Sequence, residues 1–176
     1  GGYLDNELIR IGLPEELATA TSALRQFGLG GQVDALERHM NRAAEQAARE
    51  AVPVFAHAIR SMRPADAYSV IQGESDAATA FLREQAEDTL RERYQPVIRE
   101  QMNNVGVYRS YQPLQDAASR IPALSGLDLD LDRYITDRAL DGLFTVLAEE
   151  EARIRADPAA RTTDLLRRFF GDTDGA

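Results

Sequence analysis

The sequence predicts an all-α protein, folded as an irregular single-domain bundle of about seven helices. Apolar residues recur every three or four positions along most of the chain, which is the spacing of one buried helix face. Prolines stand where first helical turns would begin, and glycines follow several periodic stretches, as expected at helix ends. Only residues 8–11 alternate in a strand-like way, and we expect them to be extended within an N-terminal segment of residues 1–13.

The helical domain is expected to span residues 14–171 and to begin with a helix over residues 14–27. The second helix is predicted to be the longest, because its apolar stripe continues from Val33 to Met62. Pro53 lies within this stripe and should kink the helix, since proline donates no backbone hydrogen bond and its ring crowds the preceding turn. A short helix over residues 64–72 then ends at Gly73.

The fourth helix is predicted to begin after Ser75, a suitable N-cap, and to continue past a second internal proline, Pro96. A shorter element over residues 107–119 and a loop precede the sixth helix, which is expected to run from Asp130 to Ala156. A last helix is predicted over residues 158–171, and residues 172–176 are expected to form a disordered tail.

The charge balance excludes one class of partner. The chain carries 20 basic and 29 acidic residues, for a formal net charge of −9 and an isoelectric point near 4.8. This field repels nucleic-acid phosphates, so we expect no nucleic-acid partner. All basic residues are Arg, a bias that GC-rich coding explains and that also suits bidentate pairing with carboxylates.

Cysteine is absent, which excludes disulfides, thiolate metal sites and cysteine nucleophiles together. No apolar run reaches the roughly 18 to 20 residues that a membrane-spanning helix requires. The sequence begins at Gly1 without a signal-peptide pattern, as it would after removal of a leader.

The histidines and the acidic run give no metal site. His39 and His57 are five helical turns apart, about 27 Å along one helix axis, so they cannot share an ion. The alternating acids from Asp128 to Asp132 look like the start of a calcium loop, but the glycine and glutamate that such a loop requires are missing. We therefore expect Asp130 to be a cap, Asp132 to be a first-turn acid, and the protein to hold no metal or cofactor.

The sixth helix carries an arginine and a glycine where its apolar stripe predicts larger apolar residues. Gly142 costs about 1 kcal/mol relative to alanine, so we expect a close neighbour there, and the Ala-rich second helix is the candidate. If Arg138 is buried it requires a carboxylate, for which Asp137, Asp141 and Glu45 are available. The alternatives for Arg138 are a structural salt bridge and a contact with an anionic ligand.

Two polar patches extend this candidate site, one beside the stripe of the second helix and one at the last helix. At the second patch a threonine could cap the helix and leave N–H groups that bind an anion, although capping alone explains its presence. No catalytic residue is assigned, because no phosphate loop, nucleophile elbow or Ser/His/Asp pattern occurs. The candidate ligand-binding residues are Asn41, Arg42, Glu45, Tyr108, Tyr111, Tyr134, Arg138, Asp141, Arg161, Thr162 and Thr163.

The second half of the chain resembles a known family. The motif over residues 127–144 is LDLDLDRYITDRALDGLF, and DPAARTTDLL follows over residues 157–166. With IRIGLP at residues 9–14 and MNRAAE at residues 40–45, these motifs resemble the bacterial family catalogued as domain of unknown function 4197. Gly12 departs from the proline common in relatives. The resemblance implies an exported protein of the Gram-negative periplasm or outer envelope, with a membrane tether through a removed leader as one form.

These observations lead to one hypothesis and two alternatives. The leading hypothesis is a non-enzymatic envelope protein, a monomer or weak homodimer, that binds a small ligand or partner protein between its second and sixth helices. The first alternative is a hydrolase-type enzyme in which Glu45 or Asp141, buried next to Arg138, acts as general base. The second is a structural or assembly protein that associates through Phe169 and Phe170.

Overall fold

The computed structural model describes residues 2–26, 28, 30–104, 116 and 130–157. Its elements within these ranges are all helical and include no strand, so the predicted all-α fold is confirmed, with fewer described helices than the sequence predicts. The elements expected at residues 158–171 and 172–176, and nearly all of residues 107–119, lie outside the described residues. The described elements are a 3-10 helix (Glu15–Leu17), α1 (Ala18–Gln26), α2 (Gly30–Ala48), α3 (Ala51–Arg60), α4 (Pro64–Gln72), α5 (Ala77–Asn104) and α7 (Leu131–Ala156).

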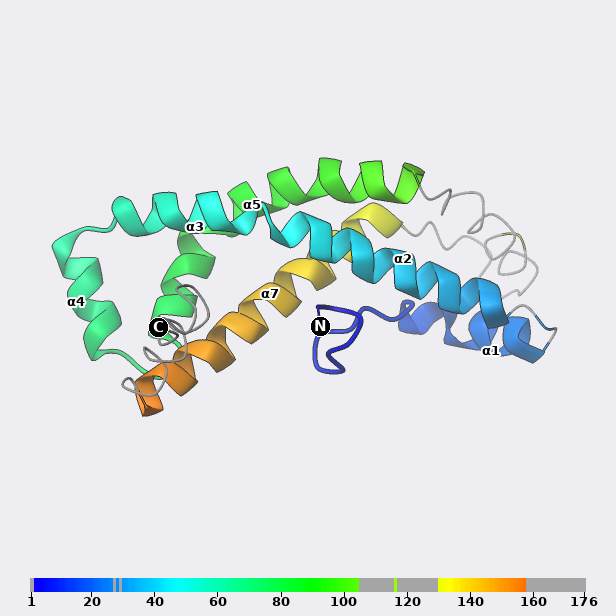
Figure 1. Cartoon of the computed structure of the whole chain (residues 1–176), viewed down its shortest axis with the longest axis horizontal. Helices are drawn as coiled ribbons and strands as arrows, with labels where there is room; N and C mark the ends of the chain where they lie inside the picture. Colours follow the sequence, from blue (N-terminus) through cyan, green and yellow to red (C-terminus); the bar gives the residue numbers. More distant parts are fainter. Residues whose placement is uncertain (1, 27, 29, 105–115, 117–129, 158–176) are drawn as a thin grey trace, which may run out of the picture.

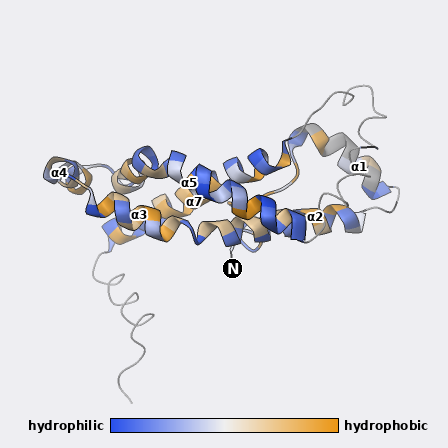
Figure 2. Ribbon diagram, turned by 90° about the horizontal axis from the view of Figure 1, so that it is seen from above, coloured by the Kyte–Doolittle hydropathy of each residue, from blue (hydrophilic) through white to orange (hydrophobic). Residues whose placement is uncertain are grey.

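The helices form a long, narrow molecule (Figures 1 and 2). The helices α2 and α3 follow one another along its length, and α5 lies beside both of them. The helix α7 crosses this layer diagonally and makes its most extensive contacts with α5. At one end of the molecule the short helix α4 connects α3 to α5 (Figure 1).

The core is built from one face of each long helix, as the apolar spacing predicts. Figure 2 shows that each helix carries both hydrophobic and hydrophilic residues, so burial depends on the face. Most of the buried apolar side chains recur three or four positions apart within each helix. They are Val33, Leu36, Met40, Ala43, Ala44 and Ala47 from α2, Leu82, Ala86, Leu90, Tyr94, Ile98 and Met102 from α5, and Leu131, Ile135, Ala139, Leu140 and Phe144 from α7.

The prediction of one continuous second helix kinked at Pro53 is wrong. The chain leaves the helix after Ala48 and begins α3 at Ala51, with a turn at Arg49 and Glu50 between them. Pro53 therefore lies in the first turn of α3, where a backbone N–H would have no helical partner and its absence costs little. The helix therefore breaks before Pro53 and does not bend at it.

The second internal proline lies inside a helix, as predicted, and the kink at it stays a prediction. Pro96 lies within α5, which continues from Ala77 to Asn104. Figure 1 shows α5 changing direction along its length, so that one half follows the end of α7 and the other half follows α2.

Helix boundaries are predicted with mixed success. The helix over residues 64–72 is confirmed as α4, and the sixth helix is confirmed as α7 with Asp130 as its N-cap, whose carboxylate accepts the backbone N–H of Arg133 at 3.0 Å. Gly28 ends α1 with a positive φ of 80°. Ser75 is exposed and lies two residues before α5, so its prediction as the N-cap is wrong.

Candidate functional site

The predicted ligand groove between α2 and α7 is occupied by the chain's own N-terminal segment, residues 2–13. Tyr3 is only 5% exposed and Ile11 is fully buried, and both belong to the same apolar core as α2 and α7. The segment contains turns and irregular backbone, with the carbonyl of Asn6 accepting the N–H groups of Ile9 and Arg10. Three of the residues predicted to meet a ligand, Asn41, Glu45 and Tyr134, therefore meet this segment.

Asn41 holds the segment by its backbone. Its side-chain oxygen accepts the N–H of Ile11 at 2.8 Å, and its amide nitrogen donates to the carbonyl of Ile11 at 2.8 Å. The same nitrogen donates to the carbonyl of Glu37 at 2.7 Å. Since Asn41 is fully buried and both of its N–H bonds are used, its amide acts as a structural clamp.

Gly142 receives Tyr3 and not the Ala-rich face of α2, so the predicted neighbour is wrong. A Cβ at position 142 would lie 2.6 Å from Cε1 of Tyr3 and 3.1 Å from Cβ of Ile9. The hydroxyl of Tyr3 donates to the carbonyl of Ala139 on the same helix. Burial, followed by the nearby carboxylate of Glu45, raises the pKa of Tyr3. The ring and hydroxyl together fix the segment to α7.

Glu45 and Tyr134 contact the same segment. The Oε1 atom of Glu45 accepts the N–H of Leu4 at 3.4 Å, and a Cβ at Gly2 would lie 2.2 Å from this atom. The hydroxyl of Tyr134 donates to the carbonyl of Gly12 at 2.9 Å. Three of the predicted ligand-binding residues thus bind residues 2–13 of their own chain.

The predicted burial of Arg138 is wrong, because its side chain is exposed. The buried face of α7 includes Ile135, Ala139 and Leu140, and position 138 lies at the edge of this face, about 60° around the helix axis from Ile135. Among the described residues no carboxylate is within ion-pair distance of Arg138. The structural salt bridge predicted for it is therefore not formed in this part of the chain.

The acids of α7 pair instead with arginines of α5. Arg83 contacts Asp141 at 2.6 Å, and Arg99 contacts Asp132 at 3.1 Å. Between these two pairs, Arg91 binds Asp137, and this hydrogen bond and the Asp137 charge raise the pKa of Arg91 against an opposing effect of burial. Along this line of contacts α5 supplies guanidinium groups and α7 supplies carboxylates.

The geometry assumed for a hydrolase is wrong. It requires a carboxylate buried next to Arg138, but Arg138 and Asp141 are both exposed, and Glu45 faces the N-terminal backbone. Arg42 is exposed as well. Tyr108, Tyr111, Arg161, Thr162 and Thr163 lie outside the described residues, and ligand binding by the predicted set stays a prediction.

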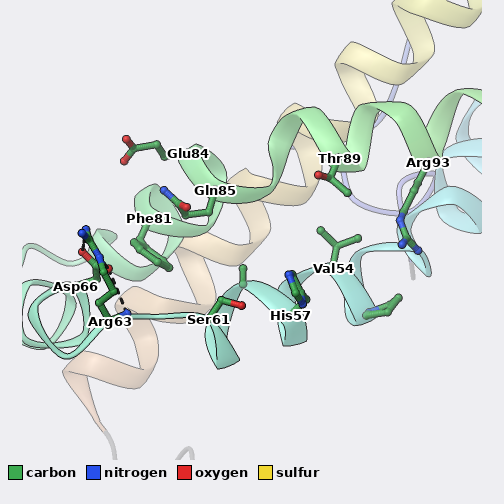
Figure 3. Close-up of a pocket in the computed structure, with 12 residues that line it drawn as sticks. Val54, His57, Ser61, Arg63, Asp66, Phe81, Glu84, Gln85, Thr89 and Arg93 are labelled. Atoms are coloured by element: carbon green, nitrogen blue, oxygen red, sulfur yellow. Dashed lines mark hydrogen bonds and ion pairs between the residues drawn. The ribbon is translucent and has the colours of Figure 1, made fainter.

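A cleft that the sequence did not reveal lies between α3 and α5 (Figure 3). Its volume is about 460 Å³. Val54 and Ala58 of α3 and Phe81 of α5 give it an apolar floor. Figure 3 shows His57 of α3 and Thr89 of α5 extending into the space between the two helices. The sequence pattern did not indicate this cleft. Its walls come from α3 and α5, and the sequence analysis did not separate α3 from the second helix at residues 49–50.

The polar groups of the cleft fall into two sets. The side chains of His57, Ser61, Gln85 and Thr89 have no hydrogen-bond partner among the described residues, so their hydrogen-bonding groups are available. The two arginines at the ends are paired, whereas Glu84, which also lines the cleft, has no ion-pair partner among the described residues. Arg63 donates to Asp66 at 2.7 and 2.8 Å, which holds the pKa of this carboxyl below its usual value, and Arg93 lies 3.6 Å from Glu50.

A second unpredicted cluster centres on Glu151, near the end of α7. Its carboxylate accepts the N–H groups of Ala78 and Thr79 at 2.8 and 2.7 Å and the Thr79 hydroxyl at 2.7 Å. It thus caps α5 in the place predicted for Ser75. Burial raises the pKa of Glu151, but these hydrogen bonds and one from Arg155 outweigh it and leave the pKa below its usual value.

Arg155 extends the cluster to α4. One of its guanidinium nitrogens donates to the carbonyl of Val70 at 2.7 Å as well as to Glu151 at 2.7 Å. The last turns of α7 therefore hold the C-terminus of α4 and the N-terminus of α5 together. Helix ends expose unpaired N–H and carbonyl groups. Here the Glu151–Arg155 ion pair satisfies both kinds, because Glu151 accepts N–H groups of α5 and Arg155 donates to a carbonyl of α4.

Within the described ranges no cluster of three or more His, Asp or Glu side chains could hold a metal ion. No described helix is both long and apolar enough to cross a bilayer.

The molecule is thus an all-α protein whose N-terminal segment packs between α2 and α7 and which has a cleft between α3 and α5. It belongs to the family described as protein of unknown function (DUF4197), whose profile matches residues 1–171. Neither the curated proteins nor the solved structures include a match to this chain.

Proposed function

We propose that the protein is a non-enzymatic binding module and that it takes a small ligand in the cleft between α3 and α5. The proposal rests on one observation, the combination of an apolar floor with unpaired polar side chains in a single hollow. A volume of about 460 Å³ falls within the range of about 300 to 1,000 Å³ typical of small-molecule sites. The groove between α2 and α7 is not chosen, because residues 2–13 pack into it and bind the polar side chains predicted to meet a ligand.

The cleft favours a ligand with an apolar body and hydrogen-bonding groups at its edges. Val54, Ala58 and Phe81 would contact the apolar body. His57 and Thr89 would orient the ligand, because hydrogen bonds supply direction where apolar contact supplies mainly free energy. The nearby Arg63 and Arg93 are engaged by carboxylates, so a strongly anionic ligand is not expected.

The test is a small-molecule screen that follows backbone amide chemical shifts. We expect ligands to shift the amides of His57, Ser61 and Thr89, and Ala58→Trp, which fills the floor, to weaken binding at least about tenfold, or about 1.4 kcal/mol. The control is Ala80→Trp, at an exposed position on α5 that does not line the cleft. Ligands that bind Ala58→Trp as tightly as the unmodified chain would contradict the proposal.

We also propose that the protein acts in the cell envelope, an expectation that follows from the family resemblance. Fractionation of the native host, with an antibody to the protein, tests this separately from ligand binding. Recovery with periplasmic or outer-membrane markers supports the proposal. Recovery with cytoplasmic markers alone rejects the location without affecting the cleft.

A further inference from the structure

The charges around the cleft between α3 and α5 are unevenly distributed. Figure 3 places Arg63, Asp66 and Glu84 at one end of the cleft and Arg93 at the other. Arg93 is balanced by Glu50, which lies 3.6 Å away. Arg63 is balanced by Asp66 at 2.7 Å, so the carboxylate of Glu84 is left without an ion-pair partner among the described residues. The Glu84 end of the cleft therefore carries the surplus negative charge.

Two neighbouring arginines do not neutralise Glu84. Arg60 lies on α3 but does not line the cleft. Arg83, which precedes Glu84 on α5, contacts Asp141 of α7 at 2.6 Å and Glu87 of its own helix at 3.0 Å. The carboxylate of Glu84 is therefore available to a ligand.

An aromatic ring lies at the same end of the cleft. Phe81 stands three residues before Glu84 on α5, so the two side chains are neighbours on the helix surface. Figure 3 shows the ring of Phe81 extending from α5 into the cleft. The face of an aromatic ring attracts an organic cation, and a nearby carboxylate adds to this attraction. Together the two groups favour a positively charged organic group over a negatively charged one.

We propose that the ligand of the cleft is an organic cation, a protonated amine attached to an apolar body. This inference rests on the proposed function and specifies the class of ligand. The ammonium group would lie near Glu84 and Phe81, and the apolar body would extend along Val54 and Ala58. A metal ion is not the expected cation, because within the described ranges no cluster of three or more His, Asp or Glu side chains could hold one.

Three probes of equal length separate the effect of charge from that of apolar contact. They are phenylpropylamine, phenylpropanol and phenylpropionate, which end in an ammonium, a hydroxyl and a carboxylate group at neutral pH. Titrations that follow the backbone amide shifts of the full chain should give the tightest binding for the amine and the weakest for the carboxylate.

Two variants test the residues assigned to the cation. Glu84→Gln should weaken binding of the amine about two- to fivefold, as expected for an ion pair of an exposed carboxylate, and leave binding of the alcohol unchanged. Phe81→Leu keeps the site apolar and should also weaken the amine about two- to fivefold relative to the alcohol. Glu100→Gln is the matched control, since Glu100 is exposed on the same helix and does not line the cleft.

The outcomes distinguish this inference from the proposed function. Phenylpropanol that binds as tightly as phenylpropylamine, or a Glu84→Gln variant that weakens both equally, would overturn the inference and leave a ligand-binding cleft in place. Failure of all three probes to bind would count against the cleft itself, and the proposed function and this inference would then fall together.

Discussion

The ring of Tyr3 occupies the space that a side chain at position 142 would take. A Cβ at Gly142 would lie 2.6 Å from Cε1 of the ring, closer than real Cβ atoms approach a neighbour. Tyr3 and Gly142, which are 139 positions apart in sequence, are thereby packed against one another near the middle of α7. The glycine is explained by this contact and not by a bound ligand.

Gly142→Ala should lower the free energy of unfolding by about 1 to 3 kcal/mol, because the added methyl displaces the Tyr3 ring. In a Tyr3→Ala background the same substitution should cost less, since the ring is gone and alanine is the better helix former, although Cβ of Ile9 remains close at 3.1 Å. Denaturant unfolding of the four proteins in this cycle measures both values. Equal effects in the two backgrounds would show that Tyr3 and Gly142 are not coupled.

Asn41→Ala should lower the free energy of unfolding by about 2 to 4 kcal/mol, because it leaves the buried N–H and carbonyl of Ile11 without partners. Hydrogen exchange should also quicken in residues 2–13. Arg42→Ala is the neighbouring control and should stay within about 0.5 kcal/mol, since Arg42 is exposed. Matching losses in the two variants would rule out the clamp.

Tyr94→Phe should raise the free energy of unfolding by up to about 1 kcal/mol. Tyr94 is fully buried, and its hydroxyl has no hydrogen-bond partner among the described residues, so its removal ends a desolvation penalty. Tyr3→Phe should have the opposite sign, a loss of about 1 kcal/mol, because the Tyr3 hydroxyl bonds to Ala139. Thermal or denaturant unfolding distinguishes the pair, and a destabilised Tyr94→Phe would indicate a hidden partner.

Glu151→Gln should lower the free energy of unfolding by about 1 to 3 kcal/mol at pH 7, because charged hydrogen bonds to α5 and Arg155 are weakened. The folded protein lowers the pKa of Glu151 below its ordinary value of 4.5. The stabilisation is therefore fully present above pH 4.5 and is lost as the pH falls through the folded-state pKa.

The measurement for Glu151 is denaturant unfolding of both proteins from pH 7 into the acid range. The difference between them should shrink below pH 4.5. Glu149→Gln provides the control, since Glu149 is exposed on the same helix and should show little effect at any pH. A Glu151 difference that persists unchanged in acid would argue against the charged hydrogen bonds.

Much of the fold could be predicted because helical periodicity and capping are local. The range of α4, the N-cap Asp130 and the buried face of α2 all follow from residues close together in sequence. Pro53 was misplaced because a proline is compatible with both an internal bend and a first turn. Which one forms is decided by the packing of α3 against α5, which the sequence pattern does not specify.

The candidate site was harder to predict because its contacts join distant segments. Gly142 correctly indicated a close neighbour, but nothing in the local pattern identified that neighbour as Tyr3. The sequence analysis placed the buried face of this helix about one residue away from where it lies. One residue turns a helix by about 100°, which is enough to move Arg138 from a buried position to an exposed one. The cleft between α3 and α5 had no local signal at all.

The line of charges between α5 and α7 has a consequence for helix pairing. The three arginines on this side of α5 each pair with an acid of α7, and Glu87 of α5 also pairs with Arg83 and Arg91. The arrangement thus favours α7 as the partner helix of this face of α5.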